Sequence, residues 1–498
     1  MKSGKTNRRT SRETMDLSAS REPLPADFDD LVGRITESVT SDDMTAVRID
    51  PLHLAYFHIE TIVDLKRLHE EIVPQFERFS ASPGKWKMWF SRGESRERLA
   101  DALSDLTRGN VLIVHRDLKG QAVSIPLPEF KTRKIETPKI EKVLLGAKES
   151  YVEDLDTNVS MLRRWIKDIN LTVNYCTAGE RTKSKIALVY FRDMANPEWV
   201  EEITANLKKI NIDRILGHKD LMEQIIGRNQ TVFPLYEMTE VPARTAYFLN
   251  EGRIAILLEG SPFAAILPTV LVNMLQAAEY LGQGSLVPLF VRLIRLLSAF
   301  LALYAPAIYV ALVSVNTGII PSELGFTIAS DRSGIPYPVV VEALALFITL
   351  DIFLESTSFV PGVIGPAVNI VGSLVIGQAA AQANLVSQTS IIFAAITAIG
   401  TFLSMFQMTY ALRIWKYPLL IAASFLGVFG IIAVTVVMVG HLAGLKSLGV
   451  PYLSPLAPLR LKDLISGFFT PRDISEDKKR LQMWKTVDQN KQGTDPDA

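Results

Sequence analysis

Three carboxylates stand in a stretch of the sequence that is otherwise apolar. Glu342, Asp351 and Glu355 are the charged residues between positions 333 and 412. On insertion scales an ionised carboxylate at the centre of a bilayer costs about 2.5 to 3.5 kcal/mol, so residues of this kind need a partner or a role. Because rings of acidic side chains line cation paths in channels, we expect these three to be pore or gating residues.

Helical spacing separates the three acids into two sets. At 100° per residue, Asp351 and Glu355 are about 40° apart around a helix, whereas Glu342 is about 180° from Asp351. The first two can therefore share a face, which Glu342 cannot join in a straight helix. The alternative is that Asp351 and Glu355 are solvated at a membrane surface and that a partner helix satisfies Glu342.

Three amides form a further set of pore or gating candidates. These are Asn369, Gln378 and Gln382, of which the last two are one helical turn apart and face the same way. Small residues surround them, so the alternative is a polar contact between closely packed helices.

Little else in the sequence indicates chemistry. Arg181, Lys183 and Lys185 precede an apolar run and are candidate contacts for a partner or an anion, the alternative being a solvated loop. The six histidines have no metal-ligand spacing, and no phosphate-binding glycine motif occurs. We therefore expect no catalytic residue, no metal and no cofactor.

The candidates require a membrane domain to position them. The 57 residues from Ser356 to Leu412 contain no Asp, Glu, Lys or Arg, whereas a spanning helix needs about 20 apolar residues. Arg292 and Arg295 precede the first clear span and place the N-terminal region in the cytosol by the positive-inside tendency. The expected spans are Leu296–Val315, Pro338–Leu354, Val363–Ala383, Val386–Phe406 and Tyr417–Gly440, with Gly260–Ala278 as a weaker candidate that could instead lie at the interface.

The N-terminal half has the alternating α and β patterns of small α/β domains. Expected strands are 54–59, 110–115, 171–177 and 186–191, and expected helices are 62–76, 96–106, 155–166 and 197–210. The whole chain is therefore expected to be multi-domain, with a cytosolic α/β region of two small domains followed by a helical integral membrane domain. The expected parts are a disordered basic tail (1–29), a first α/β domain (30–130), a linker (131–150), a second α/β domain (151–255), the membrane domain (256–445) and a C-terminal interfacial segment with a polar tail (446–498).

Charge and cysteine content exclude other classes. The 53 basic residues balance the 53 acidic ones, and only the N-terminal dozen residues are clearly basic, so a strongly basic nucleic-acid-binding protein is excluded. A single cysteine, Cys176, cannot form an intramolecular disulfide, which fits a reducing compartment for the extramembrane part.

Several blocks of sequence resemble the A-subunit family of spore germination receptors, the GerA type. The resemblance covers roughly residues 140 to 465. Its blocks are Glu153–Asn158, Leu162–Arg164, Gly179–Lys185, Asn250–Leu257, Ile320–Leu324, Gly334–Pro338, Glu342–Leu344, Ile370–Ala380 and Gly449–Pro458.

The resemblance implies a multi-pass subunit of a nutrient (germinant) receptor in the inner membrane of a spore. It implies a transporter-like B subunit and a lipoprotein C subunit as partners, and an A subunit that forms homo-oligomers and a ligand-gated ion channel. Phe347 and Leu354 stand where the family usually has charged residues, so the chain is either an adapted subunit or a divergent paralogue.

Two other functions fit the membrane segments. A secondary transporter would use Gly- and Pro-interrupted helices, as at Pro361–Pro366, to bind a small solute or ion at the bilayer midplane. No internal repeat of the membrane segments supports this alternative. A scaffold subunit of the receptor that does not conduct ions is the third possibility.

Overall fold

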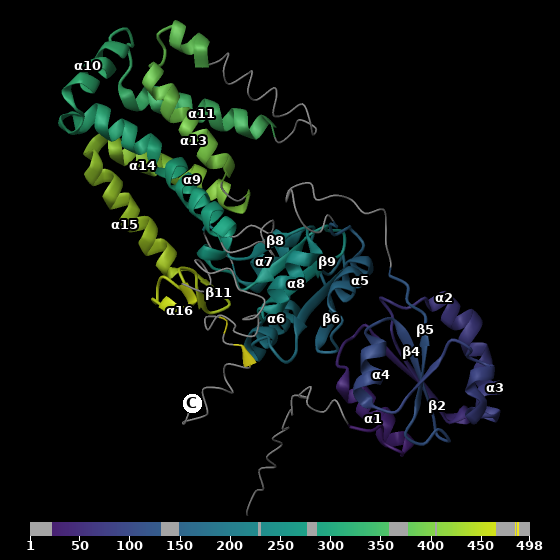
Figure 1. Ribbon diagram of the computed structural model, residues 1–498. Coiled ribbons are helices and arrows are strands. Elements are labelled where there is room, and N and C mark those ends of the chain that lie inside the picture. Colours follow the sequence, from purple (N-terminus) through teal and green to yellow (C-terminus); the bar gives the residue numbers. More distant parts are fainter. Residues whose placement is uncertain are drawn as a thin grey trace, which may run out of the picture. The chain divides into compact units, whose positions relative to one another are not determined.

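The computed structural model describes residues 22–130, 149–227, 231–275, 286–357, 377–403, 406–464, 484 and 486–487. These residues form two compact units (Figure 1). The first unit takes its residues from 1–227, 238–267 and 484–498, and the second from 228–237 and 268–483. The first unit contains two five-stranded sheets covered by helices, and the second is mostly helical. An N-terminal α/β region followed by a helical region agrees with the expected fold class. The expected domain boundaries stay predictions.

The first α/β domain is an antiparallel sheet between two helical layers. Alternate residues of its central strands enter two separate cores, so the strand over 54–59 is buried along its whole length. The sheet order is β1-β2-β4-β5-β3. The strands are β1 (Met44–Ile49), β2 (Leu54–Ile59), β3 (Glu94–Arg96), β4 (Asn110–His115) and β5 (Ala122–Pro126); the helices are α1 (Phe28–Ser38), α2 (Leu65–Arg67), α3 (Phe76–Ala81) and α4 (Leu99–Leu106). Helices α1 and α4 cover one face and α2 and α3 the other (Figure 1).

Two expected strands of this domain are confirmed and two expected helices are wrong in part. β2 and β4 begin and end at the expected residues. The expected helix over 62–76 is divided into short turns around Pro74, because proline has no N–H to continue a helical ladder. The expected helix over 96–106 begins only at Leu99, because residues 94–96 pair with β5 as a strand.

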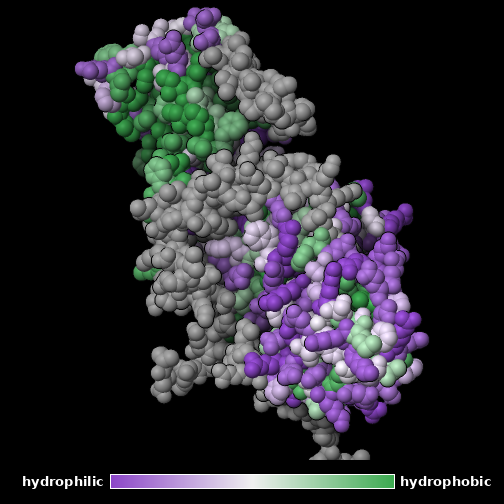
Figure 2. Space-filling model, turned by 45° about the vertical axis from the view of Figure 1, so that its right-hand side comes forward, coloured by the Kyte–Doolittle hydropathy of each residue, from purple (hydrophilic) through white to green (hydrophobic). Residues whose placement is uncertain are grey.

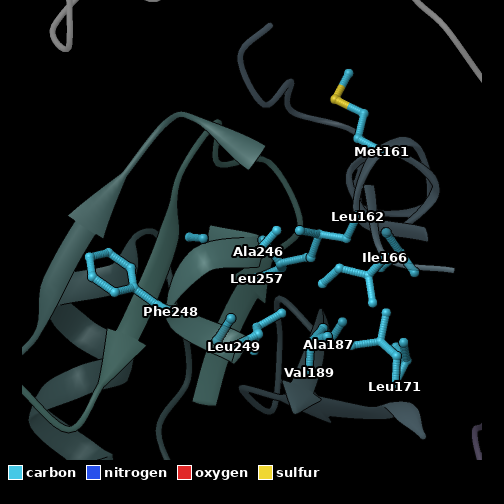
Figure 3. Close-up of a cluster of buried hydrophobic side chains, with 14 of the residues drawn as sticks. Met161, Leu162, Ile166, Leu171, Ala187, Val189, Ala246, Phe248, Leu249 and Leu257 are labelled. Atoms are coloured by element: carbon cyan, nitrogen blue, oxygen red, sulfur yellow. The ribbon is translucent and has the colours of Figure 1, made fainter. Parts of the chain in front are cut away.

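The second α/β domain is also an antiparallel sheet, with the order β6-β7-β9-β10-β8. Leu162 of its first helix and Ile166, directly after that helix, pack in one core with Leu257, Ala187 and Val189 of the sheet (Figure 3). The strands are β6 (Leu171–Ala178), β7 (Ser184–Phe191), β8 (Glu237–Thr239), β9 (Ile254–Leu258) and β10 (Ala264–Leu267); the helices are α5 (Leu155–Trp165), α6 (Pro197–Lys209), α7 (His218–Ile225) and α8 (Pro242–Asn250). The expected strands and helices of this domain are confirmed to within two residues at most ends.

The helix starts in this domain follow from local chemistry. The side chain of Asn196 accepts a hydrogen bond from the backbone N–H of Glu198, and Pro197 occupies the first turn of α6. Asp154 caps α5 in the same way through the N–H of Thr157. These contacts confirm the start expected for α6.

A buried ion pair joins the two α/β domains. Arg163 of α5 contacts Asp43 through two nitrogens, at 2.7 and 3.0 Å, and both side chains are 1% exposed. Arg163 also donates to the Ser41 hydroxyl at 2.8 Å. The same hydroxyl accepts the Val173 N–H of β6, and the N–H of Tyr175 donates to the Asp42 carboxylate. The loop before β1 therefore pairs with the edge of the second sheet.

The second unit is a helical bundle followed by a small hairpin. Helix α9 packs against α13 and α14, and α14 also packs against α11 and α15. The helices are α9 (Leu286–Val310), α10 (Ser322–Asp331), α11 (Val339–Thr357), α13 (Gln388–Leu403), α14 (Phe406–Leu426), α15 (Val428–Gly444) and α16 (Leu461–Leu464); the hairpin strands are β11 (Lys446–Ser447) and β12 (Val450–Pro451). A π-helical turn extends α9 to Val315.

The helices agree with some of the expected spans and correct others. Among the described residues one helix, Leu289–Val315, is long and apolar enough to cross a membrane, while α13 and α15 are apolar but shorter. The expected span Tyr417–Gly440 is wrong as a single helix, because Gly427 has a φ of +59° and separates α14 from α15. The candidate span Gly260–Ala278 is wrong over its described part, which contains β10 and a 3₁₀ helix. Most of the expected span Val363–Ala383 lies outside the described residues.

On the face seen in Figure 2, the described surface of the second unit is largely hydrophobic below a hydrophilic top. Large apolar side chains along α15 are open to the outside, among them Phe429 at 77%, Val436 at 65% and Val437 at 64% exposed. Contiguous apolar surface on this scale indicates contact with lipid or with another protein.

Candidate functional site

The acids of α11 do not stand alone, because charged residues of α14 face two of them. Asp351 contacts Lys416 Nζ at 2.8 Å and Arg413 Nε at 3.3 Å, and it accepts a hydrogen bond from the Tyr417 hydroxyl at 2.5 Å. Arg413 also reaches Glu355, at 3.0 Å. We call these five residues the α11–α14 cluster: Asp351, Glu355, Arg413, Lys416 and Tyr417.

Helical spacing on both partners brings the α11–α14 cluster together. Asp351 and Glu355 are four residues apart and share Arg413, as expected from their angular separation. Arg413, Lys416 and Tyr417 likewise lie on one face of α14. The formal charges of the two acids and the two bases cancel, and the Lys416 side chain is only 3% exposed.

Glu342 belongs to a different set of contacts at the start of α13. One of its carboxylate oxygens accepts hydrogen bonds from the N–H and the hydroxyl of Ser387, at 2.6 and 2.8 Å. The other oxygen forms an ion pair with Arg332, and Glu342 as a whole is 1% exposed. Arg332 and Ser387 also contact the hydroxyl of Tyr309.

A second acid completes this site. Asp331 accepts hydrogen bonds from the backbone N–H groups of Gln388 and Thr389 and from the Thr389 hydroxyl. Carboxylates at a helix start satisfy unpaired N–H groups and the positive end of the helix dipole. We call this set the α13 cap cluster: Tyr309, Asp331, Arg332, Glu342, Ser387 and Thr389.

The partners of the acids were not found from the sequence. Arg413 and Lys416 lie 58 and 65 residues beyond the acids that they contact. A signal for them existed, since Arg413, Lys416 and Tyr417 repeat at three- and four-residue spacing directly after the uncharged stretch. Asp331 and Arg332 likewise precede the helix that carries Glu342.

The amide candidates do not take part in either cluster. Gln378 and Gln382 are exposed, and the described contacts of both clusters include neither of them. Asn369 lies outside the described residues. Their expected pore or gating role stays a prediction.

The basic candidates lie around the turn between β6 and β7. Arg181 is 82% exposed and is 3.6 Å from Asp213, while Lys183 is exposed with a φ of +44°. Lys185 pairs with Asp156 at 2.9 Å and lies over the Tyr175 ring. Two of the three cations therefore have a carboxylate nearby, and their role in binding an anion or partner stays a prediction.

One buried histidine has a shifted ionisation. His218 of α7 is hydrogen-bonded to the Ser261 hydroxyl through Nδ1 and to the Ile256 carbonyl through Nε2, which donates. Burial lowers the pKa of His218 to about 4, although the bond to Ile256 opposes the shift. Ile256 lies in β9 and Ser261 in the turn before β10, so these two contacts link α7 to the β9–β10 hairpin. No group of three metal-ligating side chains occurs among the described residues.

Comparisons with known proteins identify what the chain resembles. Residues 29–483 match the family described as Bacillus/Clostridium GerA spore germination protein. Spore germination protein KA of Bacillus subtilis (strain 168) is 34% identical over 90% of this chain and 83% of its own length. The uncharacterized membrane protein YfkQ of the same organism is 32% identical over 74% and 72%. A crystal structure of the N-terminal domain of the A subunit of the Bacillus megaterium spore germinant receptor GerK3 matches with 26% identity and a TM-score of 0.36, covering 49% of this chain and 95% of that domain.

Proposed function

The chain belongs to the Bacillus/Clostridium GerA spore germination protein family, and on this premise we propose that it is the A subunit of a germinant receptor. In this role it is a multi-pass protein of the inner spore membrane, with its N-terminal α/β region in the cytosol. It works beside a transporter-like B subunit and a lipoprotein C subunit. Several copies assemble and contribute to an ion channel that nutrient binding opens.

The helical unit supports insertion into a membrane. Leu289–Val315 has the length and composition of a spanning helix, and the arginines before Leu296 favour a cytosolic start. The apolar side chains of α15 are not expected to face water, because the surface of a water-soluble protein rarely exposes so many of them together. Lipid would cover them. The relative YfkQ is named a membrane protein.

The contacts of the α11–α14 cluster support the proposal that α11 and α14 form a gate. Ionised residues in a membrane segment are costly, and those that occur face a bundle interior or an ion path and pair with one another. Removing one partner of a buried pair costs about 3–5 kcal/mol because the remaining charge is left uncompensated, so Asp351 stays paired with Lys416 and Arg413 as long as α11 and α14 are packed together. Separation of the two helices would release Asp351 and Glu355 to attract cations.

Gating then follows as a shift between two arrangements. In the closed arrangement the bases of α14 neutralise the acids of α11, as in the described structure. In the open arrangement the acids face the ion path. Nutrient bound to the receptor favours the open arrangement only to the extent that it binds that arrangement more tightly.

Two substitutions in spores test this proposal because they act in opposite directions. Asp351→Asn also breaks the contacts with Lys416 and Arg413, but it removes an acid that attracts cations to the ion path, so the rates of ion release and germination after nutrient is added should fall at least about tenfold. Lys416→Met removes a base that holds the acids, so ion release should begin at lower nutrient concentration or without nutrient. The rate of release and germination is measured in spores with matched levels of the protein.

Glu323→Gln is the matched control, because Glu323 is an exposed acid of α10 in the same unit. It should germinate like the wild type. If both cluster variants also behave like the wild type at normal protein level, the cluster is not a gate. Reconstitution separates the other functions: saturable solute flux by this chain alone indicates a transporter, ion current that requires the partners indicates a channel, and neither indicates a scaffold.

A further inference from the structure

The chain enters and leaves the helical unit at the same place. Residues just after β10 pair with residues just after α15: the Thr269 N–H donates to the Ser447 hydroxyl at 3.1 Å, and the Leu271 N–H donates to the Tyr452 carbonyl at 2.9 Å. The Ser447 hydroxyl also donates to the Leu235 carbonyl. The hydrocarbon core of a bilayer is about 30 Å thick, so hydrogen-bonded segments lie on one side of it.

The C-terminal tail returns to the second α/β domain. Trp484 is fully buried, and the Arg253 guanidinium lies between its ring, at 5.3 Å, and the ring of Phe248, at 4.2 Å. The Val487 N–H donates to the Met194 carbonyl at 3.1 Å. Removal of water strengthens a cation–π contact of this kind.

A glycine makes room for the tail. Gly252 has a φ of +83°, and a Cβ added to it would lie 2.4 Å from Cγ2 of Thr486. The hydrogen bond, the stacked arginine and the close glycine contact are three features of one docking site. The tail is therefore held by the second α/β domain as a specific ligand.

We propose that Trp484, Thr486 and Val487 dock the C-terminal tail on the side of the membrane that holds the N-terminal α/β domains, so that the intervening chain crosses the membrane an even number of times. The inference rests on the proposed membrane location. It adds a binding site on the second α/β domain, formed by Phe248, Gly252, Arg253 and Met194, whose occupant is the tail of the same chain.

Labelling of single cysteines tests the sidedness. In a Cys176→Ser full-length chain, Glu201→Cys reports on the second α/β domain, Glu323→Cys on the segment after the first span, and Gln492→Cys on the tail. With a membrane-impermeant maleimide on intact protoplasts, Glu323→Cys should react, whereas Glu201→Cys and Gln492→Cys should react only after permeabilisation.

The outcomes separate the two proposals. Reaction of Gln492→Cys but not Glu201→Cys in intact protoplasts would overturn the shared sidedness. Protection of Glu323→Cys in intact protoplasts would overturn the membrane crossing itself, and the inference with it.

A pair of glycine variants tests the docking. Gly252→Ala and Gly260→Ala impose the same left-handed strain, with φ of +83° and +79°, but a Cβ at Gly260 meets nothing within 4 Å. Gly252→Ala should speed tryptic cleavage between Lys485 and Thr486 on the order of tenfold in the full-length membrane protein, because it opens the docked segment locally. Gly260→Ala should cleave at the wild-type rate, and equal rates in both variants would overturn the docking.

Discussion

At the residue scale, the buried histidine of α7 makes stability depend on pH. The pKa of His218 is lowered to about 4 in the folded chain, against about 6.5 when unfolded. Between these values the unfolded chain takes up a proton that the folded chain does not. The contribution of His218 to stability is therefore fully present above about pH 6.5 and is lost as the pH falls toward 4.

Lowering the pH from 7 to 4.5 should cost the wild type about 2.5 kcal/mol through His218. His218→Gln should be less stable than the wild type at pH 7 but should lose less stability on acidification. The measurement is the thermal midpoint of the purified full-length chain at both pH values. Burial also lowers the pKa of His58 to about 4, so part of the pH dependence of stability should remain in both the wild type and His218→Gln. An unchanged pH dependence in His218→Gln would contradict the assignment.

The acids show how far single residues can be interpreted from sequence. Glu342, Asp351 and Glu355 stand out because a charge in an apolar helix is costly, and their division into two faces follows from helical geometry. Their partners could not be identified, because Arg413 and Lys416 approach only through the packing of α14 on α11. Pairing over such distances depends on tertiary structure, which residue spacing along one helix does not contain.

At the element scale, one glycine determines where two helices separate. Gly427 has a φ of +59° and a ψ of −136°, a region that only glycine occupies without strain. A Cβ there would be 1.9 Å from Oδ1 of Asn316, which accepts the N–H of Val428. Hydropathy alone predicts one span over Tyr417–Gly440. A hydropathy pattern contains no information on backbone conformation and therefore does not show the break at Gly427.

Gly427→Ala should therefore destabilise the helical unit by at least about 2 kcal/mol, through backbone strain and loss of the Asn316 contact. The amount of folded protein in the membrane fraction and its thermal midpoint measure the effect. Gly440→Ala is the control, since a Cβ there meets nothing within 4 Å and alanine is the better helix former. Equal stability of the two variants would show that the break does not depend on glycine.

At the scale of the whole molecule, two α/β domains act as one unit because a loop of the first pairs with the second. Arg163 and Asp43 are both buried where they meet. Arg163→Met would leave the Asp43 carboxylate buried without its counter-charge.

We expect Arg163→Met to lower the stability of the full-length chain by about 3–5 kcal/mol. The adjacent Arg164→Met should cost less than about 1 kcal/mol, because Arg164 forms a more exposed pair with Glu149. Urea unfolding followed by tryptophan fluorescence compares the two. Similar losses for both arginines would mean that the pair does not join the domains.

The order of the α/β elements and the presence of an apolar helical part could be predicted from periodicity and composition. The return of the tail could not, because Trp484 lies in a polar sequence and its importance comes from Arg253 and Phe248, more than 200 residues earlier. Local patterns identify elements, while contacts between distant segments decide how the elements are joined.

The cancelling charges of the α11–α14 cluster have a consequence for how the protein senses its surroundings. The electrical potential across a membrane acts on each elementary charge moved through it, with about 2.3 kcal/mol per 100 mV. Two acids and two bases that move together carry no net charge through that field. A change of transmembrane voltage would therefore exert no net force on the paired cluster as a whole, whereas a separation of α11 from α14 that moves the acids alone along the field would carry charge through it.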